Sequence, residues 1–158
     1  MKTRGFEIIS KQQFEKDCGD NFQYEDIKLP RRATAKSAGY DMYSLIDFTL
    51  QPGKDAKLPT GIKSYMLHNE ALFAYPRSSL GFKYYCRLAN TIGVVDADFY
   101  NNEDNEGHIW IKIRNESDKP MVIRKGEAIV QLIFQKYLLA DGDSFTGDER
   151  KGGFGSTN

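Results

Sequence analysis

Three polar side chains have the types and neighbours that chemistry on a phosphate requires. Asp96 follows the turn-prone run Gly-Val-Val, where a carboxylate can activate a water molecule. Arg77 and Ser78 place a guanidinium fork beside a hydroxyl, and Arg binds phosphate in bidentate fashion more readily than Lys does. Hydrolysis of a phosphoanhydride needs a positioned nucleophile and neutralised oxygen charge. These residues are therefore candidates for that reaction.

Several of the candidate residues also have a purely structural interpretation. The Asp96 carboxylate can hydrogen-bond the backbone of its own turn. Ser78 or Ser79 can cap a short helical turn over 80–84, although a helix start also attracts anions. Phe99 alone is typical of an ordinary core aromatic. Taken one at a time, these residues leave both interpretations open.

The C-terminal part of the chain differs in composition from the rest. Residues 141–158 are polar and rich in Gly, and the run Gly-Gly-Phe-Gly at 152–155 is too rich in Gly to stay ordered unless a partner holds it. A ligand-covering lid would explain such a tail, because closure also excludes water. We expect a folded body over residues 1–140 and a flexible lid over 141–158.

Motifs of other nucleotide and metal sites are missing. No G-x-x-x-x-G-K-[ST] occurs and no G-x-G-x-x-G follows a strand, which excludes a P-loop and a dinucleotide fold. The run 68–70 matches the H-x-E half of a zinc deaminase site, but the P-C-x-x-C half is missing and His108 is the only other histidine. Residues 96–98 begin like a calcium loop, yet Tyr100 occupies the fifth position. What remains is chemistry by carboxylates, arginine, serine and backbone amides.

Charge and hydropathy exclude further classes. Twenty-two Lys and Arg balance twenty-two Asp and Glu, so no general nucleic-acid footprint is expected. The longest uninterrupted apolar run is 71–75, whereas a membrane span needs about 20 residues. Cys18 and Cys86 are too few and too far apart for a disulfide scaffold. We expect a soluble protein of the cytoplasm that binds neither nucleic acid nor membranes.

The elements that must position these side chains are mostly strands. Turn signals recur every 8–12 residues between segments rich in Ile, Val, Tyr and Phe, which indicates an all-β fold. Alternation over 109–114 predicts a strand with its isoleucines on one face. The segments 121–124 and 127–137, separated by Lys-Gly, predict a β-hairpin, and 5–10 predicts an opening strand.

Helices have little support in the sequence. Ser10 and Gln13 can form a capping box ahead of Phe14 and Cys18, but a surface turn or loop explains the same residues at least as well. The acidic, Asn-rich stretch 101–107 is most simply a solvated loop.

Five short segments, weak one by one, occur together in a fixed order. They are AGYDMYS (38–44), PRSSLG (76–81), NTIGVVDADF (90–99), GEAIVQLI (126–133) and RKGGFGST (150–157). In this combination the chain resembles the trimeric dUTP diphosphatases over roughly residues 29–158. The resemblance implies a jelly-roll-like β-barrel and a homotrimer whose three chains share three active sites. It also implies hydrolysis of dUTP to dUMP and pyrophosphate, assisted by Mg²⁺.

The resemblance assigns roles on the phosphate side. Asp96 is implied as the general base, whose water attacks the α-phosphorus. Arg77 and Ser78 are implied to hold the α- and β-phosphates. Ser79 helps through its amide, and Gln131, which interrupts the apolar run 128–134, contacts the α-phosphate region. Asp41 is implied to support Mg²⁺ through bound water, because Mg²⁺ gives up its waters reluctantly.

The resemblance also assigns the nucleoside and the lid. Asn90 and the hairpin backbone at Gly93, Val94 and Val95 are implied to surround uracil, and Phe99 to stack on deoxyribose. Cytosine would leave polar groups of such a site unpaired. In the tail, Phe154 is implied to stack on uracil, with further contacts to the phosphates from Arg150, Gly155, Ser156 and Thr157.

Some departures from the family pattern accompany the resemblance. The stretch 100–107 is longer and more acidic than the family's usual connection, the spacing from Arg150 to Phe154 is one residue shorter, and Ser79 stands where Gly is common. The alternatives are a dCTP deaminase-type enzyme of the same fold and a catalytically silent relative that senses nucleotides or binds a protein. The run 93–96 and the Phe154 lid favour the diphosphatase.

Overall fold

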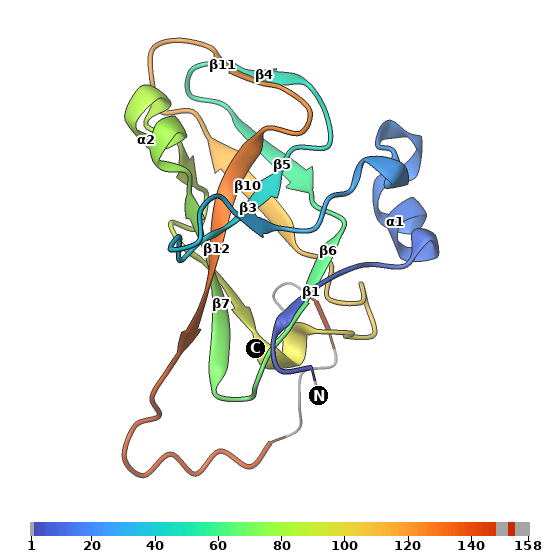
Figure 1. The fold of residues 1–158 in the computed structure, drawn as a ribbon, viewed down its shortest axis with the longest axis vertical. Coiled ribbons are helices and arrows are strands. Elements are labelled where there is room, and N and C mark those ends of the chain that lie inside the picture. The colour runs from blue at the N-terminus through green and yellow to red at the C-terminus, as the bar shows by residue number, and fades with distance from the viewer. Residues whose placement is uncertain (1, 148–151, 154–158) are drawn as a thin grey trace.

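The computed structural model describes residues 2–147 and 152–153 of the chain, and most of its regular structure is antiparallel β (Figure 1). The strands are β1 (Gly5–Ile8), β2 (Arg31–Arg32), β3 (Tyr40–Tyr43), β4 (Phe48–Leu50), β5 (Asp55–Pro59), β6 (Ile62–Tyr65), β7 (Glu70–Pro76), β8 (Arg87–Leu88), β9 (Gly93–Asp96), β10 (Trp110–Arg114), β11 (Met121–Ile123) and β12 (Ala128–Lys136). The helices are α1 (Lys11–Cys18) and α2 (Ser78–Tyr84), with 3-10 turns η1 (Gly19–Asn21), η2 (Tyr24–Asp26) and η3 (Ala97–Phe99).

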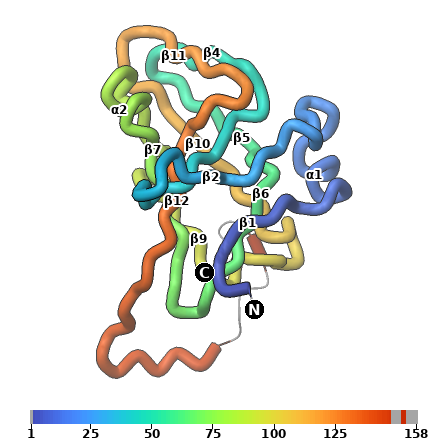
Figure 2. Tube along the Cα trace, viewed as in Figure 1, coloured from blue at the N-terminus to red at the C-terminus, as the bar shows by residue number. Residues whose placement is uncertain are grey.

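The largest sheet has five strands in the order β2-β3-β12-β7-β9. Smaller sheets are formed by β5-β10-β8, by β1-β6 and by β11-β4. Figure 2 shows β12 passing through the middle of the molecule, with β9 beside β7. The predicted all-β fold class is confirmed. Among the described residues, no helix is long and apolar enough to cross a membrane.

The predicted alternation over 109–114 is confirmed in β10. Ile111 and Ile113 are buried in the core while Lys112 between them is exposed. The strand itself begins one residue later than predicted, at Trp110, and the preceding Ile109 is also buried. The period of two therefore placed the core face of this strand correctly.

The predicted hairpin of 121–124 with 127–137 is wrong in its pairing. Both strands exist and the turn between them forms, since the Glu127 N–H donates to the Arg124 carbonyl at 2.9 Å. However, β11 pairs with β4, whereas β12 pairs with β3 and β7. Ser44 holds the turn from the other side, because its carbonyl accepts from the Gly126 N–H and its own N–H donates to the Glu127 carbonyl. The chain thus changes sheets at this turn.

The N-terminal segment forms a helix rather than the surface turn that the sequence left open. Ser10 caps α1, because its Oγ accepts from the Gln13 N–H at 3.1 Å. Only half of a capping box forms, since the Gln13 side chain donates to Asp17 and does not return to Ser10. Phe14 and Cys18 are buried beneath the helix, as their spacing requires.

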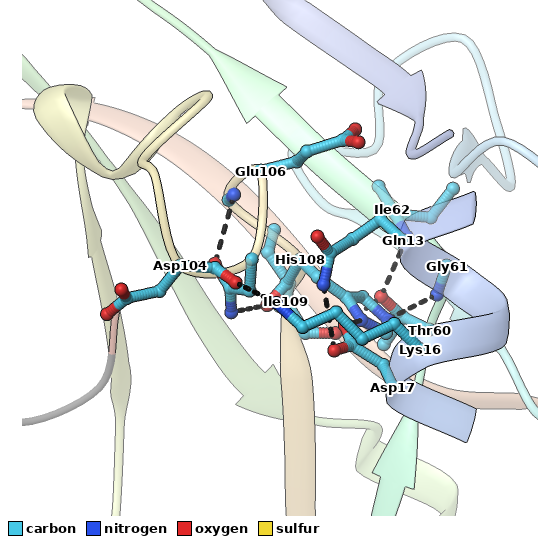
Figure 3. A network of polar contacts seen from close by, with 12 residues as sticks. Gln13, Lys16, Asp17, Thr60, Gly61, Ile62, Asp104, Glu106, His108 and Ile109 are labelled. Atoms are coloured by element: carbon cyan, nitrogen blue, oxygen red, sulfur yellow. Dashed lines mark hydrogen bonds and ion pairs between the residues drawn. The ribbon is translucent and has the colours of Figure 1, made fainter. Parts of the chain in front are cut away.

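A buried histidine connects α1 to the β-structure (Figure 3). His108 is fully buried, and its Nε2 accepts from the Gly61 N–H at 2.9 Å. The ring proton therefore lies on Nδ1, which donates to Asp17 Oδ2 at 2.6 Å. Burial lowers the pKa of His108 below its ordinary value, although the Asp17 carboxylate acts in the opposite direction. A neutral imidazole therefore joins α1 to the turn between β5 and β6.

The stretch 101–107 is only in part the solvated loop that was predicted: Asn101, Glu103 and Asp104 are exposed, but Asn102 and Gly107 are buried. Asn102 is buried, its amide nitrogen donates to the Phe99 carbonyl at 2.8 Å, and its Oδ1 accepts from the N–H groups of Asp104 and Asn105. Glu106 accepts from the backbone and the hydroxyl of Ser10. Acidic and amide side chains here replace the backbone partners that a strand would supply.

Candidate active site

Three elements of the large sheet bring polar side chains to one place. Gln131 on β12 lies opposite Asp41 on β3 and opposite Tyr75 on β7 in the antiparallel register. Arg77 follows directly after the last residue of β7. The sheet thus places Asp41, Gln131 and Arg77 side by side, although they lie far apart in the sequence.

Asp41 and Arg77 form an ion pair in this part of the sheet. Arg77 Nη1 donates to Asp41 Oδ2 at 2.5 Å, and the two side chains are 31% and 15% exposed. The other carboxylate oxygen, Oδ1, has no hydrogen-bond partner within the described residues. The pair leaves further guanidinium N–H donors for an anion, because Arg carries five.

A cavity of about 170 Å³ opens over this pair. Its walls contain five of the six residues that the sequence predicts around the phosphates, namely Asp41, Arg77, Ser78, Ser79 and Gln131. The sixth, Asp96, does not line the cavity. Ala33, Ser37 and Gly39 complete the walls. A Cβ on Gly39 would lie 2.6 Å from Gln131 Oε1 and 3.1 Å from Gln131 Cβ, so a larger residue here would displace the Gln131 side chain. Gln131 Nε2 also donates to the Pro76 carbonyl at 3.2 Å, so its amide is held at the cavity wall.

The sequence did not indicate Ala33 and Ser37 as wall residues. They belong to the connection between β2 and β3, where Ser37 Oγ and Thr34 Oγ1 are 2.7 Å apart in a tight turn. The only signal for that turn is its content of small and hydroxyl residues, which is common to many loops.

The serines after Arg77 do not cap a helix. The helix α2 starts at Ser78, its N-cap position is Arg77, and no side chain caps it. The alternative that Ser78 or Ser79 acts as a cap is therefore wrong. Both serines are exposed at the cavity, and their hydroxyls have no hydrogen bond to any residue of the described ranges.

Asp96 lies at the other end of the same sheet. It is the last residue of β9, the edge strand beside β7, and it is exposed. Its side chain does not cap η3, which starts at the next residue. The N-cap position therefore gives no support to the interpretation that the Asp96 carboxylate hydrogen-bonds the backbone of the turn that follows it.

The register of β7 and β9 separates Asp96 from the cavity. Asp96 lies opposite Ala71, and Arg77 comes six residues after Ala71 along β7. At about 3.4 Å per residue, the two positions are about 20 Å apart along the strand. One chain therefore does not bring its own Asp96 to its own Arg77.

The predicted nucleoside-side residues gather around β9. Gly93 and Val95 are half-buried and Val94 is exposed in that strand. Asn90 is exposed in the turn before it, where the Ile92 N–H donates to the Asn90 carbonyl at 2.8 Å. Phe99 is buried in the core cluster, as its structural interpretation requires.

The predicted lid residues lie outside the described residues: Arg150, Phe154, Gly155, Ser156 and Thr157. Of the tail's Gly-rich run, Gly152 and Gly153 are described, and Gly153 is buried. Its N–H donates to Asp104 Oδ2 at 2.8 Å, in the stretch 101–107.

Comparisons with known proteins decide the family. The family pattern described as dUTPase matches residues 25–158 of this chain. The chain belongs to the dUTPase family. A deoxyuridine 5'-triphosphate nucleotidohydrolase of Lactococcus lactis subsp. lactis (strain IL1403) is 45% identical over 158 residues, which cover 99% of each chain.

Solved structures of dUTPases share the fold. The crystal structure of a dUTPase from Streptococcus mutans has a TM-score of 0.70 and 38% identity, covering 87% of this chain and 99% of that one. A mutant dUTPase from phage phi11 of S. aureus, solved with a structural Mg(II) ion, has a TM-score of 0.65 over 94% of this chain and all of that one. At 16% identity, the phage enzyme indicates the fold alone.

Proposed function

We propose that this dUTPase hydrolyses dUTP to dUMP and pyrophosphate at sites that combine the Arg77 cavity of one chain with the Asp96 end of another. Hydrolysis of dUTP is the activity of the family to which the chain belongs. The observation that carries the placement of the site is the cavity lined by Asp41, Arg77 and Gln131, because it offers cationic and amide donors to phosphate oxygens.

The cavity supplies the phosphate-binding groups. Arg77 keeps donors beyond the one that Asp41 occupies, so it can bind a phosphate while its orientation is held by the ion pair. Ser78 and Ser79 add hydroxyl groups at the entrance, and the Gln131 amide faces the same space. Ion pairing with Asp41 prevents the long Arg77 side chain from taking other rotamers, which reduces the entropy cost of binding.

The donor set at Asp41 fits Mg²⁺. A half-buried carboxylate presents one oxygen without a partner among the described residues, at a cavity that would hold the phosphates. Mg²⁺ keeps several waters and is usually bound through one or two carboxylates and substrate phosphates. Asp41 would hold the ion through water, and the ion when bound would neutralise phosphate charge.

Asp96 acts as the general base. Its carboxylate accepts a proton from a water molecule whose oxygen attacks the α-phosphorus of dUTP. The new P–O bond forms as the bond to the bridging oxygen of the β-phosphate breaks, and pyrophosphate leaves. Asn90 and the backbone of Gly93–Val95 bind uracil, while Phe99 lies beneath the deoxyribose from its place in the core.

A homotrimer with shared sites would join the two halves. The separation of about 20 Å within a chain requires a second chain to bring Asp96 to Arg77. In addition, an extended arm follows β12 (Figure 2), on which Leu138 is 96% and Phe145 83% exposed. Large apolar side chains of this kind indicate a surface that another chain covers.

Both cysteines are free and buried, which supports a reducing compartment such as the cytoplasm.

The substitution Asp96→Asn tests this assignment. The amide cannot accept the proton, so turnover should fall at least about 100-fold, while binding of the non-hydrolysable analogue dUpNHpp measured by calorimetry should stay close to that of the parent. Asp118→Asn, an exposed carboxylate between β10 and β11, is the matched control and should keep full turnover. Normal turnover of Asp96→Asn would remove Asp96 from the role of base.

A further inference from the structure

The N-terminal strand β1 contacts the end of the large sheet that carries Asp96. Arg4, just before β1, donates from Nε to Glu70 Oε2 at 3.0 Å and from Nη2 to Glu70 Oε1 at 2.5 Å. Glu70 is buried and begins β7, one residue before Ala71, which lies opposite Asp96. This bidentate ion pair therefore ties β1 to the part of β7 that holds β9.

A hydrogen bond attaches β1 to the chain that follows Asp96. Tyr100 is the residue after η3, and its hydroxyl donates to Glu7 Oε2 at 2.6 Å. The Glu7 side chain is 29% exposed, and Tyr100 is half-buried. The hydrogen bond from Tyr100, and next the one from Lys2, lower the pKa of Glu7 below its ordinary value. Glu7 is therefore a carboxylate at neutral pH, and Tyr100 is the donor.

The Tyr100 ring is contacted by β6, the partner strand of β1. Tyr65 packs against it edge to face, with ring centroids 5.9 Å apart, and Lys63 Nζ lies 5.3 Å from its centroid. In the register of the two strands, which lie side by side in Figure 1, Glu7 is opposite Lys63. The β1-β6 sheet thus holds both the ring and the hydroxyl of Tyr100. β1 precedes residues 25–158, so this support includes a strand that the dUTPase pattern does not cover.

The turn η3 connects Asp96 to Tyr100. Asp96 is the last residue of β9 and occupies the N-cap position of η3. Phe99 is buried, and its carbonyl accepts from the backbone and side-chain nitrogens of Asn102. Tyr100 lies only four residues after Asp96, so a displacement of its side chain moves the backbone from which the Asp96 carboxylate projects.

We propose that Tyr100 is a positioning residue for the reaction: its hydroxyl, held by Glu7 of β1, fixes η3 and with it the direction of the Asp96 carboxylate. This rests on the proposed function, in which Asp96 takes the proton of the attacking water. A general base works only within hydrogen-bond reach of that water, so a small displacement slows proton transfer. The groups proposed to bind the nucleoside precede Asp96 or, as Phe99, are fixed in the core, so the Tyr100 bond acts on the chemical step more than on affinity.

Tyr100→Phe tests the proposal, because it removes the hydroxyl and keeps the ring. Well below the melting temperature, kcat for dUTP should fall about three- to tenfold, while the Kd of dUpNHpp stays within about twofold of the parent. Tyr24→Phe is the matched control, since the hydroxyl of Tyr24, in η2, donates to the Ile9 carbonyl at 2.8 Å. Both variants lose one hydrogen bond, so their melting temperatures should fall by similar amounts, but only Tyr100→Phe should lower kcat.

Changes at Glu7 test the same bond from its other side. Glu7→Gln keeps an oxygen that accepts from Tyr100 and should keep kcat within about twofold of the parent, whereas Glu7→Ala should lower kcat as Tyr100→Phe does. Lys2→Ala removes the other partner of Glu7 and should leave kcat unchanged. Because Glu7 is partly exposed, these variants decide the matter even where Tyr100→Phe does not fold, and a parent-like kcat of Glu7→Ala would overturn the proposal.

The double variant of Tyr100→Phe with Asp96→Asn shows whether the hydroxyl acts through Asp96. If it does, the hydroxyl's removal adds less than about twofold to the loss caused by Asp96→Asn alone. A further loss of about three- to tenfold in this background would overturn the positioning role, as would an equal loss of kcat in Tyr24→Phe. A large loss in Asp96→Asn beside a parent-like kcat in Tyr100→Phe would remove the positioning role alone. Normal turnover of Asp96→Asn would instead remove the base role on which it rests.

Discussion

Arg77 and Asp41 form an ion pair across a strand that neither of them belongs to. Arg77 follows β7 and Asp41 lies on β3, with Gln131 of β12 between them in the register. The cavity over this ion pair therefore depends on the correct pairing of three strands, because each strand places one of its wall residues.

The first prediction concerns the fork of Arg77. Arg77→Lys keeps the charge but loses the bidentate geometry and the hydrogen bond to Asp41, so kcat/KM for dUTP should fall about tenfold or more. Steady-state kinetics would check this. Arg87→Lys is the control, since Arg87 lies on β8 of another sheet and its ion pair there, with Glu116, is exposed. Equal kinetics of Arg77→Lys and Arg87→Lys would contradict the assignment.

The second prediction concerns sites shared between chains. Preparations of Asp96→Asn alone and of Arg77→Ala alone should each be nearly inactive. Co-expressed in equal amounts they should regain about a quarter of the parent's activity, because a site then takes an intact Asp96 and an intact Arg77 from different chains. Activity of the co-purified mixture, with both tagged chains present, gives the answer. Absence of recovery would place both residues of a site in one chain.

The third prediction concerns the tail. Removal of residues 152–158 should slow turnover at saturating dUTP, because the nucleotide would then be less shielded from water. The fold should persist, since β12 ends at Lys136. Circular dichroism and the melting temperature serve as the control for folding. A truncated chain with the parent's kcat and KM would show that the tail takes no part in catalysis.

The fourth prediction concerns pH and stability. Because burial lowers the pKa of His108, the unfolded chain binds a proton that the folded chain does not as pH falls below 6.5, the ordinary value for His. The free energy of unfolding should therefore decrease between pH 7.5 and 5.5, measured from urea midpoints. His108→Asn should remove much of this slope, whereas His68→Gln, an exposed histidine, should keep it. An identical slope in His108→Asn would contradict the prediction.

Part of the fold could be predicted from local patterns. The alternation at 109–114 identified the face of β10 because a period of two has one geometric meaning in a strand. The turn at Lys125-Gly126 was equally visible, but a turn says only that the chain reverses. Which sheet the next strand joins depends on Ser44, which lies about eighty residues earlier in the sequence.

Elements with unusual polar contacts were harder to predict. The charges of 101–107 are typical of a solvated loop, yet Asn102 and Glu106 are used to satisfy buried or neighbouring backbone groups. Likewise, the cap at Ser10 was visible, but the burial of Phe14 depends on the β-structure beneath it. Such contacts join segments that are far apart in the chain, so no short stretch of sequence contains both partners.

The candidate site, like the fold, could be predicted only in part. The residue types at 41, 77 and 131 could be recognised from short segments, and the cavity brings them together. The separation of Asp96 from that cavity follows from the register and length of β7, which the segments do not encode.

Within residues 2–147 and 152–153, β12 is the last strand to be synthesised, and it is the strand that joins β3 to β7. Until it is synthesised, both of those strands present unpaired backbone groups on one side. Residues 77–127 are synthesised between β7 and β12, so for about a third of its translation the nascent chain carries two open strand edges at which another chain could pair.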